Sequence, residues 1–453
     1  MMSATVEPQN KPATLRRVGM KEIVESRNDS PGFMLKMAQT YGGVAGMSFM
    51  GIELHYVTDP DVVRELVINH PQHLHKDFIT IPVFKRIVHN GIVVAEGEHW
   101  KRQRKIMQPA FHATRIQSYA DVMTQYTQEM IHDWQGGQIN LTKAMKQLTQ
   151  RIIAKTMYNV DVQEQLDQLD RLMYIVFSEA EAQLKSRIPI PAWIPTTPSR
   201  RRQAQAVKKV RALLQKIIDE RRASGEDKGD LLSMLLQVRY DDGTPMDDEQ
   251  LLDECMTMFV AGHETTASTM IWVWYLITQH PDVASKLYAE VDNTLGEQPM
   301  RFEKLADMPY GEMIVKEALR LYPPAPAFVR TPLQDIEVNG HLFRKGSLIA
   351  CAIYAMHHLE HLFPQPERFW PERFGPEQPE PHRYAYIPFG AGSRSCMGNM
   401  FAMMEARVIL ATMAQQVELE LTEGQTVERD TRFTIQPKEP LWVRVKRRRV
   451  LPV

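Results

Sequence analysis

The stretch "FGAGSRSCMG" at residues 389–398 places one cysteine inside a loop that is punctuated by glycines. Gly390, Gly392 and Gly398 permit backbone conformations and close approaches that other residues resist. The sequence that follows Cys396, "CMGNMFAMMEARVILATMAQQV", predicts a strongly apolar helix with the thiol at its start. The free amides and the positive dipole end of such a helix stabilise a thiolate, which is the form needed in a nucleophile or a metal ligand.

Three interpretations of Cys396 fit this setting. A nucleophilic thiolate needs a histidine base and an orienting group, and the sequence singles out none of its 15 histidines. A thiolate ligand suits haem iron, which takes one axial donor from the protein. Cys255 and Cys351 lie too far along the chain to form a Cys-x-x-Cys pair with it. An inert, packed cysteine is the default for any single thiol, so other residues must decide.

Composition limits the class of protein. The chain has 453 residues, of which 43% are apolar and 24% charged, a globular balance, and its formal net charge of −1 gives no overall attraction to nucleic acid or acidic membranes. The first residues lack the apolar core of a signal peptide, and the uncharged run at 265–278 is too short to span a bilayer. We expect a soluble, cytoplasmic monomer without a membrane anchor that does not bind nucleic acid.

Hydrophobic periodicity predicts a mainly α fold with a smaller β region, an α+β class without a βαβ rhythm. Apolar residues at helical spacing predict helices that cover 120–134, 205–223 and 281–296. Strands are expected within 43–60, in a hairpin at 335–353 that turns at Asn339-Gly340, and along the last forty residues.

The whole chain, 1–453, is predicted to form a single domain. Residues 1–17 are expected to be a flexible lead and residues 444–453 a basic, solvated tail. The segment 187–202 contains four prolines, so we predict a connecting loop that shows apolar residues, of a kind that often covers the opening of a ligand site.

The longest predicted helix is "DDEQLLDECMTMFVAGHETTASTMIWVWYLITQHP". Asp247 can cap it and Pro281 stops it, which leaves a rod about 50 Å long that has to be largely buried. Gly262 in its middle costs about 1 kcal/mol relative to alanine, and it predicts a notch for a small ligand or water. Glu264 and Thr265 place an acid beside a hydroxyl, as proton delivery requires. The alternative is that Glu264 belongs to a polar stripe of the helix and that the threonines are packed in a core.

Taken together, these motifs resemble the cytochrome P450 family. "FGAGSRSCMG" (389–398) fits its haem-binding signature Phe-x-x-Gly-x-Arg-x-Cys-x-Gly at each fixed position, and "AGHETT" (261–266) fits its oxygen-activation helix. "WKRQR" (100–104), "EALR" (317–320) and "FWPERF" (369–374) match further family elements in the family's order. The resemblance covers nearly the whole chain.

The resemblance implies a haem b cofactor, held between the long central helix and the helix after the cysteine loop. Cys396 would be its axial thiolate ligand. The residues expected to bind the haem are Trp100, Arg104 and Arg394 at the propionates, with Arg330, Phe389 and Gly398. A structural ion network beneath the haem loop is expected to consist of Glu317, Arg320 and Arg373; without the family, Glu317 and Arg320 are an ordinary i, i+3 pair.

The implied activity is a monooxygenase that activates O2 with two electrons and two protons and hydroxylates a hydrophobic small molecule. Thr265 and Glu264, with Cys396, would be its catalytic residues. The alternative is a non-catalytic haem-thiolate protein that binds a ligand or senses a gas, which has no need of the acid and hydroxyl pair. A cysteine hydrolase is a third possibility and lacks an evident base.

Electrons would come from a separate ferredoxin or flavodoxin with its reductase. A basic patch of Lys101, Arg102 and Lys105 is a candidate docking surface for such an acidic partner, although a solvated helix face explains it equally well.

Substrate identity is predicted only by class. The candidate pocket residues, by family position, are Phe259, Ala261, Ala327, Phe328 and Ile435. All are apolar, which favours a fatty acid, terpenoid or steroid, and "AGHETT" with the proline-rich segment looks most like the fatty-acid and lipid-oxidising branch of the family.

Overall fold

The computed structural model describes residues 15–134, 136–185, 197–431 and 434–449. Helices dominate, with a smaller amount of sheet, which confirms the predicted fold class. The chain separates into two compact units, and the expected single domain stays a prediction. The first unit runs to Phe78 and includes Pro326–Glu367 and Glu380–Ser395; the second comprises Ile79–Ala325, Arg368–Pro379 and Cys396–Val453.

The first unit is built on a six-stranded sheet of order β1-β2-β3-β9-β6-β4. The strands of this unit, with the separate β7–β8 pair, are β1 (Arg16–Arg17), β2 (Val44–Phe49), β3 (Ile52–Val57), β4 (Leu74–Lys76), β6 (Phe328–Pro332), β7 (Ile336–Val338), β8 (His341–Phe343) and β9 (Leu348–Cys351). Asn339 and Gly340 adopt φ of 48° and 78°, so the predicted hairpin turns where expected.

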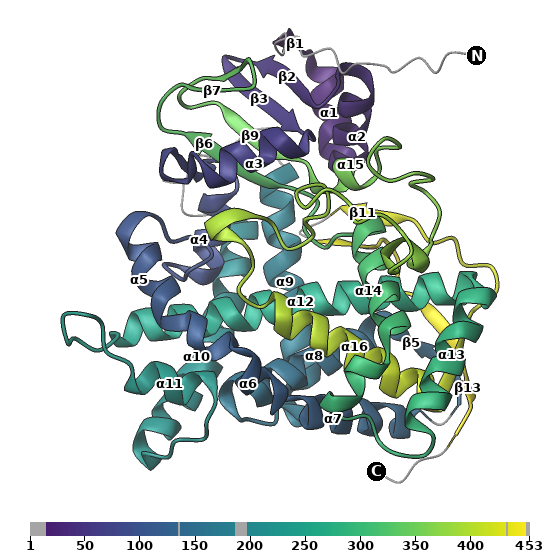
Figure 1. Ribbon diagram of the computed structural model, residues 1–453. Helices are drawn as coiled ribbons and strands as arrows, with labels where there is room; N and C mark the ends of the chain where they lie inside the picture. Colours follow the sequence, from purple (N-terminus) through teal and green to yellow (C-terminus); the bar gives the residue numbers. More distant parts are fainter. Residues whose placement is uncertain (1–14, 135, 186–196, 432–433, 450–453) are drawn as a thin grey trace, which may run out of the picture. The chain divides into compact units, whose positions relative to one another are not determined.

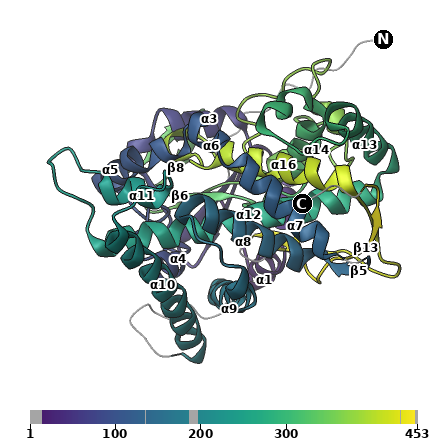
Figure 2. The ribbon, with the colours of Figure 1, turned by 90° about the horizontal axis from the view of Figure 1, so that it is seen from below.

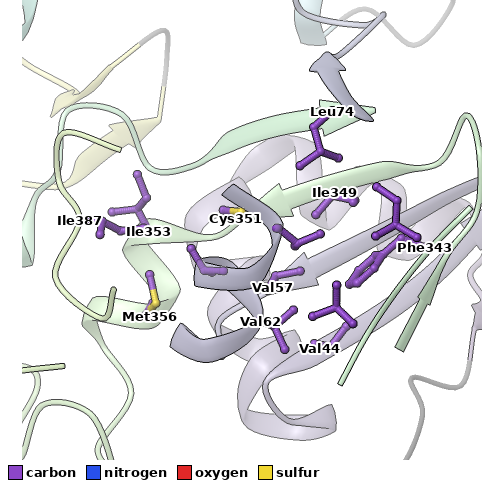
Figure 3. Packing of buried hydrophobic residues seen from close by; sticks show 14 residues of the cluster. Val44, Val57, Val62, Leu74, Phe343, Ile349, Cys351, Ile353, Met356 and Ile387 are labelled. Atoms are coloured by element: carbon purple, nitrogen blue, oxygen red, sulfur yellow. The ribbon is translucent and has the colours of Figure 1, made fainter. Parts of the chain in front are cut away.

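The described residues of the first unit form four α-helices: α1 (Met20–Asn28), α2 (Ser30–Tyr41), α3 (Pro60–Ile68) and α15 (Ile353–His357). Helix α3 starts at the predicted place because the Asp59 carboxylate accepts hydrogen bonds from two backbone amides of its first turn. Its apolar face joins a core cluster with the sheet, in which Val62 of α3, Val57 of β3 and Ile349 of β9 are all fully buried (Figure 3).

The second unit is a helical body arranged around one long helix, α12 (Asp248–Gln279). Its other α-helices are α4 (Ile81–Val88), α5 (Gly97–Met107), α6 (Ala113–Gln117), α7 (Ala120–Asp133), α8 (Leu141–Tyr158), α9 (Leu166–Lys185), α10 (Pro198–Ser224), α11 (Leu231–Gln237), α13 (Pro281–Leu295), α14 (Pro309–Leu321) and α16 (Asn399–Gln416). Both views place α8 and α16 beside α12 (Figures 1 and 2). The Asp247 carboxylate caps α12 by accepting the Gln250 amide at 2.8 Å, as predicted.

Two small sheets complete the second unit. One has the order β10-β13-β5, and the other is the β11–β12 pair. Their bounds are β5 (Gly137–Asn140), β10 (Val417–Leu421), β11 (Arg429–Thr431), β12 (Ile435–Pro437) and β13 (Trp442–Arg447).

The structure corrects the basic tail predicted for 444–453. Residues up to Arg447 form strand β13. Val443 and Val445 are buried, whereas Arg444 and Lys446 are exposed, which is the alternation of a strand with one covered face. Arg448 then pairs with Asp292 at 2.7 Å. Residues 450–453 lie outside the described residues.

Two other segment predictions need correction. The flexible lead expected over 1–17 ends earlier, because Arg16 and Arg17 form β1 and pair with Met47 and Ser48 of β2. The loop expected over 187–202 also ends earlier, because Pro198 occupies the first turn of α10, where a missing amide proton costs nothing. Residues 1–14 and 186–196 lie outside the described residues.

Candidate functional site

Cys396 lies just before α16, whose N-cap is Gly398. The residue as a whole has exposed surface, whereas Cys255 and Cys351 are buried, yet protein atoms lie close around the Cys396 sulfur. Desolvation by the surrounding protein raises the pKa of the Cys396 thiol, while the Gly398 amide and the charge of Arg104 oppose that rise. The two opposing groups are the ones that would favour a thiolate once the sulfur has a partner.

The loop before the cysteine depends on glycine. Gly390 and Gly392 have φ of 70° and 72°, in the left-handed region that favours glycine. A Cβ on Gly392 would also lie 2.6 Å from the Val67 carbonyl oxygen, so a larger residue would clash with the backbone there. The sequence signature therefore encodes a loop conformation as well as a thiol.

Helix α5 carries two of the predicted haem-binding residues, Trp100 and Arg104. They are four residues apart and share one face, and both are half-buried. Burial lowers the pKa of Arg104, and the Cys396 charge opposes this shift, which places the guanidinium near the sulfur. The second unit thus brings an aromatic donor, a cation and the thiol into one region.

Five further predicted residues lie in the first unit: Arg330, Phe389 and Arg394 for the haem, and Ala327 and Phe328 for the pocket. Arg330 is on β6, where its guanidinium lies over the Phe328 ring at 4.9 Å from the ring centre. A Cβ on Gly390 would lie 4.0 Å from the Phe328 ring, so β6 contacts the cysteine loop. Phe389 and Arg394 belong to the same loop, and Ala327 directly precedes β6; all three are half-buried.

The centre of α12 has one open stripe. Most of its residues are buried, yet Ala261 is exposed and Thr265, one turn later, is partly exposed. The Thr265 hydroxyl donates to the Ala261 carbonyl at 2.8 Å, and α12 continues without a break. Exposed surface halfway along a largely buried helix means that, within the part of the chain that the structure describes, side chains leave this stripe accessible.

The notch predicted at Gly262 is not open. Ile153 of α8 fills the space that a side chain would take, since a Cβ there would lie 2.4 Å from Ile153 Cδ1. Glycine is needed because α8 packs closely against α12 at this point. The accessible surface is provided by the neighbouring Ala261 and Thr265 instead.

Glu264 is buried, 4% exposed, and is surrounded by polar groups from three helices and a strand. Its carboxylate lies 3.6 Å from the Lys146 ammonium of α8 and 3.5 Å from the His263 ring, and it accepts a hydrogen bond from the Gln436 side-chain amide of β12. Burial raises the pKa of Asp170 on α9, and the Lys146 charge opposes this. Sequence reasoning missed Lys146 and Gln436, because nothing local marks either one.

The structure brings together the three residues of the predicted ion network. Arg320 makes two 2.8 Å hydrogen bonds to the Glu317 carboxylate, and Arg373 approaches the same group at 3.4 Å. Glu317 and Arg320 are completely buried, and the Trp370 amide adds a 3.1 Å bond to Glu317. A buried pair with every partner in place is structural in character.

Two of the predicted pocket residues are covered by protein. Phe259 is 3% exposed and stacks on the buried His263, and Ile435 of β12 is fully buried. The pocket role of Phe259 and Ile435 stays a prediction, whereas Ala261 is exposed.

The three cations proposed as a docking patch are each paired with a carboxylate. The pairs are Lys101 with Glu98 at 2.6 Å, Arg102 with Asp242 at 2.9 Å and Lys105 with Asp241 at 2.7 Å. The charge of each cation is therefore balanced locally, as on a solvated helix face, and the docking role of these residues stays a prediction.

Glu405 of α16 is a buried acid that sequence reasoning missed. Burial raises its pKa to about 8, and the nearby Thr266 hydroxyl of α12 opposes part of the shift. Neither carboxyl oxygen finds a hydrogen-bond partner among the described residues. No sequence signal distinguishes this glutamate from a surface one.

Comparison with known proteins matches this geometry to one family. The model of the family "Cytochrome P450" matches residues 12–444. Cyclooctat-9-en-7-ol 5-monooxygenase of Streptomyces melanosporofaciens is 34% identical, over 81% of this chain and 80% of that protein. Pentalenene oxygenase of Streptomyces avermitilis is 29% identical, over 79% and 80%. The crystal structure of the cytochrome P450DA heme domain superposes with a TM-score of 0.85 at 26% identity, covering 93% of this chain and 94% of that one.

Proposed function

The chain belongs to the cytochrome P450 family and is a monooxygenase, and from this premise we infer that it hydroxylates a hydrophobic small molecule of the terpenoid type. Two similar proteins are named for their action on a cyclic alkenol and on pentalenene. Both names denote largely apolar ring compounds. Of the three substrate classes expected from the sequence, they favour the terpenoid over the fatty acid and the steroid. The apolar Ala261 on the open stripe of α12 supports such a substrate.

A haem fits the residues of the second unit. The observation that supports this is a pair of places with accessible surface in the described part of the second unit: the Ala261 and Thr265 stripe, and Cys396. Cys396 is the proposed axial ligand, and Gly398 and Arg104 favour its thiolate form. Trp100 is the other residue of the second unit proposed to hold the haem, and the haem-binding roles of Arg330, Phe389 and Arg394, which lie in the first unit, stay predictions. Bound haem supplies the iron at which O2 is activated.

Thr265 and Glu264 are the proposed proton donors. Thr265 presents a hydroxyl on the open stripe, and Glu264 resupplies the proton from the buried side of the same helix. Both roles call for a proton held at a defined atom and moved over a short distance. The ion network of Glu317, Arg320 and Arg373 is proposed to fix the region structurally.

A separate electron donor, either a ferredoxin or a flavodoxin with its reductase, is proposed to complete the reaction. Among the described residues, none of the helices is both long enough and apolar enough to cross a bilayer. The cytoplasmic location and the monomeric state stay predictions from the sequence.

The proposed cofactor site is tested by absorption spectroscopy of the purified protein, reduced under carbon monoxide. A strongly red-shifted Soret band in the wild type that is lost in Cys396→His is the expected result. Cys351→Ser, which alters a buried thiol in the first unit, is the control and should keep the band. Equal bands in wild type and Cys396→His would overturn the assignment of the ligand.

The substrate class is tested by titrating the same protein with a cyclic terpene, a fatty acid and a steroid, following the haem spectrum and the products. Preferential turnover of the terpene is expected. Turnover of the fatty acid alone would return the assignment to the lipid-oxidising type.

A further inference from the structure

Strand β12 is fastened to α12 along a single stripe of the helix. Glu264, Ser268 and Trp272 are spaced by four residues and therefore lie on one face. The Ser268 hydroxyl and the Trp272 indole N–H both donate to the Ile435 carbonyl, at 2.5 and 2.9 Å, and the Gln436 side-chain amide donates to the Glu264 carboxylate. The strand thus makes a polar contact at each turn of this stripe.

This stripe differs from the one that is open. Thr265 follows Glu264 by one residue, which is about 100° around the helix axis. Ala261 and Thr265 have accessible surface, whereas Glu264 is buried under β12. In this arrangement the carboxylate lies on the strand side of α12 and not on the side where Thr265 presents its hydroxyl.

The groups that hold Glu264 in place come from two other elements. Gln436 is itself anchored, because its amide nitrogen also lies 2.7 Å from the Thr434 hydroxyl. Lys146 of α8 adds a cation at 3.6 Å. The other ionisable groups facing this site are His263, at 3.5 Å, and Asp170 of α9. The hydrogen bond from the amide and the attraction of the ammonium group both stabilise the Glu264 carboxylate in this position.

We propose that Gln436 is a positioning residue, which holds the Glu264 carboxylate against β12 and away from the open stripe. The proposal rests on the proposed proton role of Glu264. While the bond from Gln436 is made, the acid stays on the strand side of α12, and loss of this bond allows it to reach the side of Thr265.

The test compares Gln436→Leu, which removes the donor and keeps the bulk, with Ser268→Ala, which removes a bond to the same strand and leaves Glu264 untouched. Oxygen consumption without substrate should rise about tenfold in Gln436→Leu, the factor that corresponds to losing one hydrogen bond to a charged group. Ser268→Ala should consume oxygen at the wild-type rate. Gln436→Asn keeps an amide on a shorter side chain, and its oxygen consumption should lie between those of Gln436→Leu and Ser268→Ala.

A second measurement does not depend on turnover. The infrared carboxylate band of Glu264 is isolated by subtracting the spectrum of Glu264→Gln in each background. The band should shift in Gln436→Leu and stay in place in Ser268→Ala, because only the first variant removes a donor to this carboxylate. An equal shift in both variants would show general loosening of β12 and overturn the proposal.

The design separates failure of this inference from failure of the proposed function. If Glu264→Gln leaves product formation per electron unchanged, the proton role of Glu264 fails, and the proposal that depends on it falls too. If Glu264→Gln impairs coupling while Gln436→Leu shows the wild-type band and the wild-type oxygen consumption, the role of Gln436 is refuted and the proposed function stands.

Discussion

Glu405 gives the sharpest prediction for stability, through the substitution Glu405→Gln. The side chain is buried in α16, and its pKa is raised from 4.5 to about 8 by burial. An unfolded chain releases this proton above the lower value, whereas the folded protein keeps it up to the higher one. The folded state therefore binds more protons between the two, and its stability falls as the pH rises through this window.

The size of the effect follows from the shift. At about 1.4 kcal/mol per pKa unit, the whole window corresponds to about 5 kcal/mol, of which about 2 kcal/mol falls between pH 6 and pH 8. Glutamine has a similar volume and does not titrate. The variant should therefore gain about 2 kcal/mol on the wild type between these two pH values.

The assay is urea unfolding of both proteins at the two pH values, with the difference in free energy of unfolding as the readout. Taking the difference cancels the histidines and other groups that titrate in both proteins. Glu423→Gln, at an exposed glutamate, is the control and should show no pH-dependent difference. A difference between wild type and Glu405→Gln that does not change with pH would refute the reasoning, because Glu405 would then not be held protonated by the fold.

Three further predictions concern the centre of α12 and the buried ion network of the second unit. Thr265→Ala should uncouple electron consumption from product, seen as a lower ratio of product to reduced nicotinamide consumed; an unchanged ratio would count against its proton role. Gly262→Ala should destabilise the protein by about 1–3 kcal/mol, because the added Cβ meets Ile153, and Ile153→Ala should cost less in that background than alone. Arg320→Leu should cost about 3 kcal/mol or more in urea unfolding, because it leaves Glu317 as a buried charge without its two-bond partner; a loss below about 1 kcal/mol would contradict this.

Local chemistry was sufficient for many elements. The bounds of α12 follow from a capping carboxylate at Asp247 and a proline at 281, and the start of α3 follows from the cap at Asp59. Asn339 and Gly340 set a hairpin because they tolerate positive φ. The motif around Cys396 indicated the family, since its glycines and its thiol are defined by short-range spacing.

The basic end of the chain shows where local reasoning failed. The charges of this segment predicted a solvated tail. Its residues up to Arg447 instead belong to β13, the central strand of a three-stranded sheet, because β13 pairs with β10 along one edge and with β5 along the other. Neither partner is visible in the charge pattern of the segment itself.

What the sequence by itself determined are properties fixed within a few residues: helix caps, turns, the cysteine loop, and through them the family and its activity. What only the tertiary structure decided are the surroundings of each group. Glu264 meets Lys146 from 118 residues earlier and Gln436 from 172 residues later, and Gly262 turned out to admit Ile153 rather than a ligand. The physical reason is that capping and turn chemistry act over one turn of backbone, whereas burial and ion pairing depend on which distant elements pack together.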